Sequence, residues 1–400
     1  MSDVPQMPGP PNPFGFDLSE LMRMLQSPGP VNMEIARTTA EATATHDLET
    51  GTPAPEPPIA PDAVTAFEDV VRAVQLAVAE STGISGALTA RSQCVNRAEW
   101  SRTTLSGLEP VLGTLANALS KGGESPAEPT PGMTPDALLG MFMQQLIPLL
   151  LGGWAGSMIG FLSHHALGQY DLPLPLAGEP AMLFVVRNVD DFAAEWSLPL
   201  DELRYALALR EVVHGAQRTV PWVRDRLVQL CSNFVGAYEI GADALDVHFA
   251  DLDPSDPSSM SALEGLADPQ VLLGAMQSER QKPMLEELRR FVAVLEGYTD
   301  VVVGRLGERM VASHARIDEA LRRQRFERGE AGSFVDRLLG LQLDREHYDA
   351  GAAFCRGVVE RSDNELEQLN RLWTRDAMLP TASEFEAPGL WLARIDLPES

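Results

Sequence analysis

The chain has 400 residues, of which 57 are Asp or Glu and 31 are Lys or Arg, giving a formal net charge of −26. This composition excludes nucleic-acid partners, because phosphate binding needs clustered Lys and Arg, and no basic cluster is visible. Cys94, Cys231 and Cys355 lie far apart without metal-binding spacing, and the start has no signal-peptide pattern, so we expect a cytoplasmic protein.

Segments rich in proline and glycine divide the first third of the chain. Residues 1–14 are rich in proline and predict disorder, followed by short helices at 17–25 and 32–45. Two further breaks follow, at 52–58 and 122–132. We therefore expect a disordered start with short helices, a helical region with a linker, and a compact main domain, at 1–61, 62–133 and 134–400. Helices in the second region are expected at about 62–82 and 101–120.

The segment from Ala137 to Tyr170 contains no Asp, Glu, Lys or Arg, and its length would allow it to span a bilayer. Gly152, Gly156 and Gly160 recur every four residues, a pattern of close helix packing that is common in membranes. A core helix that is buried on all sides is equally apolar. We expect a core helix, with membrane contact as the alternative.

One strand and several helices are predicted after this apolar segment. The apolar run at 181–186 predicts a strand, and a helix should begin near Leu198 or Pro199, where proline suits a first turn. Further helices are expected at about 222–246, 284–325, 345–361 and 363–374. The predicted fold class is therefore mainly α (α+β), with a small β-sheet and a helical N-terminal region.

The helix near Leu198 carries the most informative pattern of the chain, Arg210-Glu211-Val212-Val213-His214. It reads as the zinc-hydrolase motif HExxH with the first histidine replaced by arginine. In the intact motif two histidines four residues apart share one helix face and bind one zinc, and the glutamate acts as general base. Arg210 has no lone pair to offer a metal. A glutamate and a histidine at this spacing also occur by chance on many helices.

The surrounding sequence resembles a known family over most of its length. The most unusual matching strings are LGQYDLPLP at 167–175, EWSLP at 195–199, REVVHGAQ at 210–217 and LNRLW at 369–373. They resemble the zincin-like metallopeptidases of high-GC Gram-positive bacteria, which are described as hydrolases and associated by name with the biosynthesis of a deazaflavin coenzyme. The resemblance implies a zincin-like metallopeptidase core over 134–400 and zinc as its cofactor.

The resemblance assigns roles to three residues of the site. Glu211 matches the general base, His214 the second histidine ligand and Glu296 the third ligand, whereas Arg210 occupies the position of the first ligand. The family pattern after Glu296 is E-G-H-A-[DE]-H, and this chain has E-G-Y-T-D-V, so two further histidines are missing. A catalytic zinc normally takes three protein ligands. We therefore expect zinc to bind weakly or not at all.

Several consequences of the altered motif remain open at this point. Arg210 could neutralise Glu296 or Glu211 by an ion pair, or could lie in solvent. Next to the third ligand position stand Tyr298 and Asp300, and Tyr298 either fills the space of a lost histidine or supports an oxyanion. Replacement of the missing ligand by another histidine is not expected, and the candidates for it are His164, His165, His248 and His314.

Two functions follow from these residues. The first is a zincin-fold protein without catalytic zinc that binds a peptide or protein partner in the former active-site cleft. The second is a zinc-dependent metallopeptidase or hydrolase with Glu211 as general base and an atypical ligand set. We expect the first, because both the motif and the downstream pattern have lost ligands.

Overall fold

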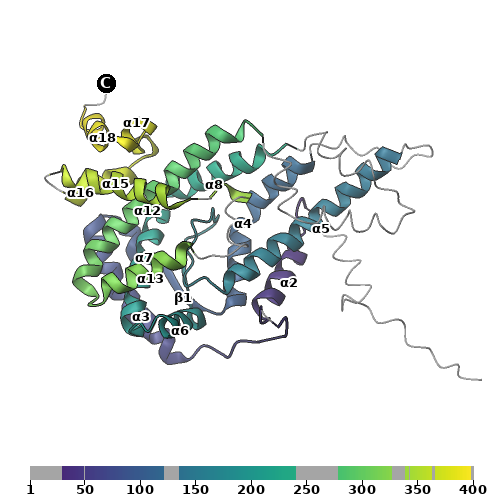
Figure 1. Ribbon diagram of the computed structural model, residues 1–400, viewed down its shortest axis with the longest axis horizontal. Helices are drawn as coiled ribbons and strands as arrows, with labels where there is room; N and C mark the ends of the chain where they lie inside the picture. The colour runs from purple at the N-terminus through teal and green to yellow at the C-terminus, as the bar shows by residue number, and fades with distance from the viewer. Residues whose placement is uncertain are drawn as a thin grey trace, which may run out of the picture.

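The computed structural model describes residues 29–48, 50–120, 135–239, 278–326, 338–341, 343–362 and 365–397. Helices dominate these residues and enclose one small sheet, as Figure 1 shows. This agrees with the predicted mainly α fold. The predicted start at 1–14, the helix at 17–25, the linker at 122–132 and His248 lie outside the described residues.

Helices α2 (Met33–Ala44) and α5 (Pro135–Ser163) pack side by side, and both contact α4 (Arg97–Ser120) (Figure 1). The three glycines of α5 explain the close approach. A Cβ atom would lie 2.4 Å from Asn32 O at Gly152 and 2.4 Å from Ala36 O at Gly156. The fourfold glycine spacing therefore serves helix packing within the fold. No helix among the described residues combines the length and apolar character needed to cross a membrane.

The sheet consists of two parallel strands, β1 (Arg91–Val95) and β2 (Ala181–Val185). Strand β2 matches the apolar run predicted at 181–186. Strand β1 was not predicted, because its sequence RSQCV is short and largely polar. On its other edge β2 forms an isolated antiparallel bridge with the segment around Gly168, where the Val185 amide donates to Leu167 O at 3.0 Å. Helix α3 (Pro61–Thr82) packs near β1, and a 3-10 turn, η1 (Ser85–Leu88), joins them.

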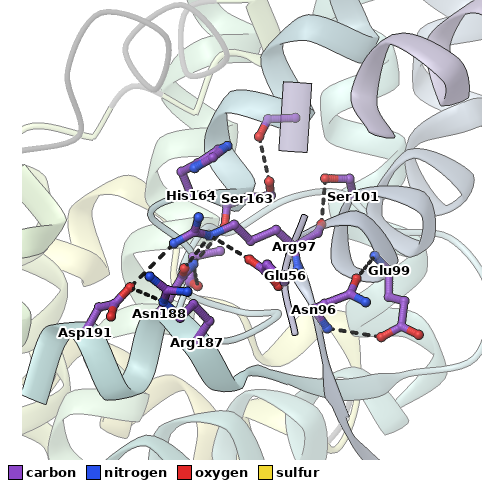
Figure 2. A network of polar contacts seen from close by, with 12 residues as sticks. Glu56, Asn96, Arg97, Glu99, Ser101, Ser163, His164, Arg187, Asn188 and Asp191 are labelled. Carbon is purple, nitrogen blue, oxygen red and sulfur yellow. Dashed lines mark hydrogen bonds and ion pairs between the residues drawn. The ribbon is translucent and has the colours of Figure 1, made fainter. Parts of the chain in front are cut away.

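Helix α6 (Val186–Glu195) follows β2 directly and begins a buried polar network, shown in Figure 2. The Asn188 amide donates to the carbonyls of Ser163 and Ala166, at 2.7 Å each, and its oxygen accepts from Arg97 Nε at 2.7 Å. Arg97 also lies 3.1 Å from Glu56 Oε1. One asparagine thus connects α6, α4 and the end of α5.

Helix α7 (Leu200–Thr219) lies at the centre of the molecule and begins one residue after the predicted proline. Every residue from Ala206 to Arg218 is buried, which is unusual for a segment with four charged or titratable side chains. Helix α8 (Pro221–Gly236) follows after a single residue. The helix predicted at about 222–246 therefore ends earlier than expected, at Gly236, and the positions from 240 onward lie outside the described residues.

The C-terminal part adds a long helix and a group of shorter ones. The single helix predicted at 284–325 is in fact two, α12 (Gln281–Met310) and α13 (His314–Phe326), because Val311 takes an extended backbone conformation. The short elements at the C-terminal end are α15 (Arg345–Glu360), α16 (Glu365–Asn370), η2 (Arg371–Trp373), η3 (Asp376–Met378), α17 (Ala382–Glu386) and α18 (Pro388–Ile395).

Helices α12 and α15 meet at two glycines, Gly297 and Gly351. A Cβ at Gly297 would lie 2.3 Å from the Gly351 backbone, and one at Gly351 would lie 2.0 Å from Ala293 O. Buried side chains from α2, α3, α4, α7 and α12 contribute to one hydrophobic core. The division of the chain at 61 and 133 stays a prediction.

Candidate functional site

The candidate site lies where α7 packs against α12. Residues four apart share one face of a helix, so Arg210, His214 and Arg218 form a row on α7, and Glu296 and Asp300 form a row on α12. The packing of the two helices brings these rows together. Arg325, on α13, joins them. We use the name ion cluster for Arg210, His214, Glu296, Asp300 and Arg325.

Arg210 pairs with both carboxylates of α12. Its Nη2 lies 3.4 Å from Glu296 Oε2 and its Nη1 lies 3.2 Å from Asp300 Oδ1, while only 10% of the Arg210 side chain is exposed. Of the alternatives left open by the sequence, the pairing with Glu296 is therefore the one present, and Asp300 is a second partner. Among the described residues no contact joins Arg210 to Glu211.

Arg325 is a member of the cluster that sequence reasoning missed. From α13 its Nη2 lies 3.5 Å from Glu296 Oε2 and 3.8 Å from Asp300 Oδ1, and its guanidinium covers the ring of Tyr348. Burial by itself would lower the pKa of Arg325, but Glu296 and Asp300 outweigh burial and raise this pKa. Two guanidiniums thus share two carboxylates. Nothing in the local sequence distinguishes Arg325 from the other arginines of α13.

His214 is the completely buried member of the cluster. Its Nε2 lies 3.6 Å from Glu296 Oε1 and has no hydrogen-bond partner among the described residues, and its Nδ1 lies 3.3 Å from Arg218 Nη1. Burial, followed by the charges of Arg218 and Arg210, holds the pKa of His214 well below its usual value. The imidazole is therefore neutral at physiological pH.

Glu211 points to the main chain of the 167–175 segment. Its two oxygens accept from the amides of Gln169, at 3.1 Å, and Tyr170, at 2.9 Å. The close approach requires glycine at position 168, where a Cβ would lie 2.3 Å from Glu211 Oε1. Burial and then the nearby charge of Asp171 raise the pKa of Glu211 well above its usual value. In this arrangement Glu211 anchors a loop through both of its oxygens.

The structure does not bring Tyr298 to the ion cluster. Two residues along a helix correspond to about 200°, so Tyr298 leaves the side of α12 opposite to Glu296. Its hydroxyl donates to Asn370 Oδ1 at 2.7 Å, and its ring meets Trp373 edge-on. Neither role considered for Tyr298, as filler of the site or as oxyanion donor, agrees with this position.

Of the other candidate histidines, His164 and His314 are engaged elsewhere. His164 Nε2 lies 3.0 Å from Thr43 O, and the ring of His314 packs so closely on Gly307 that a Cβ there would clash with it. His165 comes nearest to the cluster, since it lines a cavity shared with Arg210 and Arg325. That cavity has a volume of about 60 Å³, which is room for a few water molecules.

The donor set of the cluster does not fit a catalytic zinc. His214 Nε2 and Glu296 Oε1 lie 3.6 Å apart, whereas the Asp300 carboxylate is paired with two guanidiniums. The described residues contain no group of three His, Cys, Asp or Glu side chains arranged to hold a metal. The nearest further side chains are the guanidiniums of Arg210 and Arg325. A guanidinium about 4 Å from a divalent ion would be repelled by roughly 8 kcal/mol at an effective dielectric constant near 20.

Comparison with known proteins agrees with the resemblance of the motifs. Residues 31–392 match the model of a family described as zincin-like metallopeptidase. No curated protein matches the chain. Among solved structures, a presumed hydrolase with a novel fold from Chloroflexus aurantiacus superposes with a TM-score of 0.60 and 22% identity, over 92% of this chain and 100% of that one. At this identity the likeness shows a shared fold alone.

Proposed function

Since this chain belongs to the zincin-like metallopeptidase family, we propose that it has exchanged the family's zinc site for an ion cluster and acts by binding a peptide or protein. The observation that carries this proposal is the contact of two guanidiniums with one carboxylate oxygen. Nη2 of Arg210 and Nη2 of Arg325 lie 3.4 Å and 3.5 Å from Glu296 Oε2. The carboxylate that would bind a metal is thereby paired with two guanidiniums, which it shares with Asp300.

The position of Glu211 supports the same proposal. A general base must point to the group that it deprotonates and lie within hydrogen-bond reach of it. Both oxygens of Glu211 accept from main-chain amides. The small cavity next to Arg210 offers little space for a substrate in addition. The alternative, a zinc-dependent hydrolase with Glu211 as base, would need both the carboxylate and the arginines to move.

Zinc content per purified chain tests the proposal directly. Wild-type protein, His214→Ala and Arg210→His are analysed for metal, with Arg72→His as a control, because Arg72 lies on α3 with 72% of its side chain exposed. We expect no stoichiometric zinc in wild type or in Arg72→His. A parallel assay with fluorescent casein should show no hydrolysis above that of Glu211→Gln.

The opposite result would overturn the proposal. If wild type holds about one zinc per chain, lost in His214→Ala, the site binds metal despite its arginines. Casein hydrolysis that requires both His214 and Glu211 would restore the interpretation as an active hydrolase.

A further inference from the structure

The outer edge of β1 lines a groove that the ion cluster does not reach. The groove has a volume of about 460 Å³ and runs between α3 and α4 along residues 92–95 of the strand. Its floor contains Phe67 and Phe184, whose rings stack at 4.6 Å. Strand β2 separates this groove from the loop at 167–170 that contacts Glu211. We call it the β1 groove.

The backbone of β1 presents free hydrogen-bonding groups to this groove. The Val185 amide donates to Leu167 O, so it faces away from β1. Peptide groups alternate in direction along a strand, so the backbone amide and carbonyl of Phe184 face β1. In the parallel register Cys94 lies opposite Phe184 and Ser92 opposite Met182, which turns the amides and carbonyls of Ser92 and Cys94 outward. Within the described part of the chain, β1 has no second strand partner.

An exposed strand edge with an adjacent groove is suited to an extended peptide. Peptides add to such edges through main-chain hydrogen bonds, while alternate side chains enter pockets beside the strand. A five-residue strand is about 16 Å long at roughly 3.3 Å per residue. The groove therefore accommodates about four or five extended residues.

The charges of the β1 groove select the kind of peptide. Arg102 pairs with Glu41 at 3.7 Å, and Glu99 accepts from the Asn96 amide at 3.0 Å. Arg204, the other cation near Cys94, pairs with Asp190 and Asp201. Glu68 lines the groove next to the Cys94 thiol, and no ion pair or hydrogen bond to its carboxylate exists among the described residues. Its negative charge is thus available to a ligand.

From this geometry we propose that the β1 groove binds an extended peptide segment that carries Lys or Arg, which adds to β1 as a third strand and places its basic side chain beside Glu68. The proposal extends the binding role above by naming a ligand class, and it locates the binding away from the ion cluster. It depends on the outward peptide groups of Ser92 and Cys94 and on the free carboxylate of Glu68.

The test uses synthetic hexapeptides of alternating Val and Thr with Lys, Gln or Glu at one position, titrated into the full chain by fluorescence anisotropy. We expect the Lys peptides to bind about threefold more tightly than the Gln peptides, and the Glu peptides to bind most weakly. Methylation of the peptide amides that face β1 should weaken binding about tenfold, whereas methylation of the alternate amides should have little effect. The comparison of methylated peptides leaves the protein itself unchanged.

Two protein variants complete the test. Ser92→Pro removes one outward amide without touching the β1–β2 hydrogen bonds and should lose the peptide, with Ser92→Thr as the matched control. Glu68→Gln should remove the preference for Lys over Gln. The proposal fails if no peptide binds, or if both methylation patterns act alike. Arg210→His should bind the peptides as wild type does, because the ion cluster lies outside the β1 groove. A lack of peptide binding would overturn this proposal alone, whereas zinc in the wild-type protein would overturn the proposed function.

Discussion

Nη2 of Arg210 on α7 lies 3.4 Å from Oε2 of Glu296 on α12, in the position where the family resemblance places two ligands of one metal. The helices that would share a zinc ion are thus joined by a buried ion pair. A buried charge needs a counter-charge close by, and the arginine supplies it. The zincin arrangement of the helices can therefore persist without metal.

Restoring the histidine alone should not restore tight zinc binding, because Arg325 still lies against Glu296. In the Arg210→His background, adding Arg325→Met should tighten zinc binding about tenfold or more by removing one repulsive charge. Titration against a competing chelator measures this difference. Arg322→Met serves as control, since Arg322 is half exposed and pairs with Asp318 on the same helix. Equal zinc affinities in the presence and absence of Arg325 would show that its charge is irrelevant to the metal.

Removing the charge of Glu296 should destabilise the fold strongly. Glu296→Gln leaves Arg210 and Arg325 with Asp300 as their shared carboxylate, and breaking a buried pair from one side costs about 3 kcal/mol. Urea unfolding followed by circular dichroism gives the change in the free energy of unfolding. Glu308→Gln, at an exposed position of the same helix, should change it by less than about 0.5 kcal/mol. Similar values for the two variants would argue against a buried ion cluster.

Stability should decrease in acid through His214. The pKa of His214 is lowered in the folded protein, so the unfolded chain takes up a proton first as the pH falls below about 6.5. Between that pH and the lower folded pKa, this residue should reduce the free energy of unfolding by up to about 1.4 kcal/mol per pH unit. Above about pH 6.5 its contribution is fully present. His214→Gln should show a smaller slope in urea unfolding series from pH 7 to 5, and a slope equal to that of wild type would contradict this role of His214.

The polar network of Figure 2 should depend on Asn188. Asn188→Ala removes the side-chain donor of two buried carbonyls and one of the two partners of Arg97 Nε, which keeps Glu56, at a cost of about 3 kcal/mol. Thermal unfolding should show a clear decrease in Tm. Asn188→Asp keeps the acceptor for Arg97 but turns a carboxylate oxygen toward the two carbonyls, so its stability should improve as the pH is lowered. A pH-independent Asn188→Asp would contradict this account of the network.

The contact of α12 with α15 should tolerate no side chain at position 351. Gly351→Ala would place a Cβ 2.0 Å from Ala293 O, and the required separation of the helices should cost about 3 kcal/mol. Gly304→Ala is the matched control on α12, because nothing lies within 4 Å of a Cβ there. That substitution should stabilise the helix by about 0.5–1 kcal/mol. Two equal losses of stability would indicate that helix separation is not the cause.

The sequence by itself determined the features that depend on local periodicity and on motifs. The helix at 32–45, the strand at 181–186 and the helix beginning after Pro199 follow from apolar spacing and from residues typical of helix ends. The family and the altered ligand position, Arg210, could also be read from strings of adjacent residues. These features involve neighbours within a few positions, whose relation is fixed by the geometry of a single element.

Only the tertiary structure decided which charged groups meet. Arg325 reaches Glu296 because α13 folds back over α7 and α12 after the break at Val311. The spacing of the arginines in the sequence does not indicate this contact. Strand β1 exists because β2 pairs with it, although its own residues are largely polar. The direction of Tyr298 and the anchoring of Glu211 likewise depend on how helices pack. Charge pairing acts over a few ångströms in space, and the chain positions that it joins in the ion cluster lie as far as 90 residues apart, as from Arg210 to Asp300.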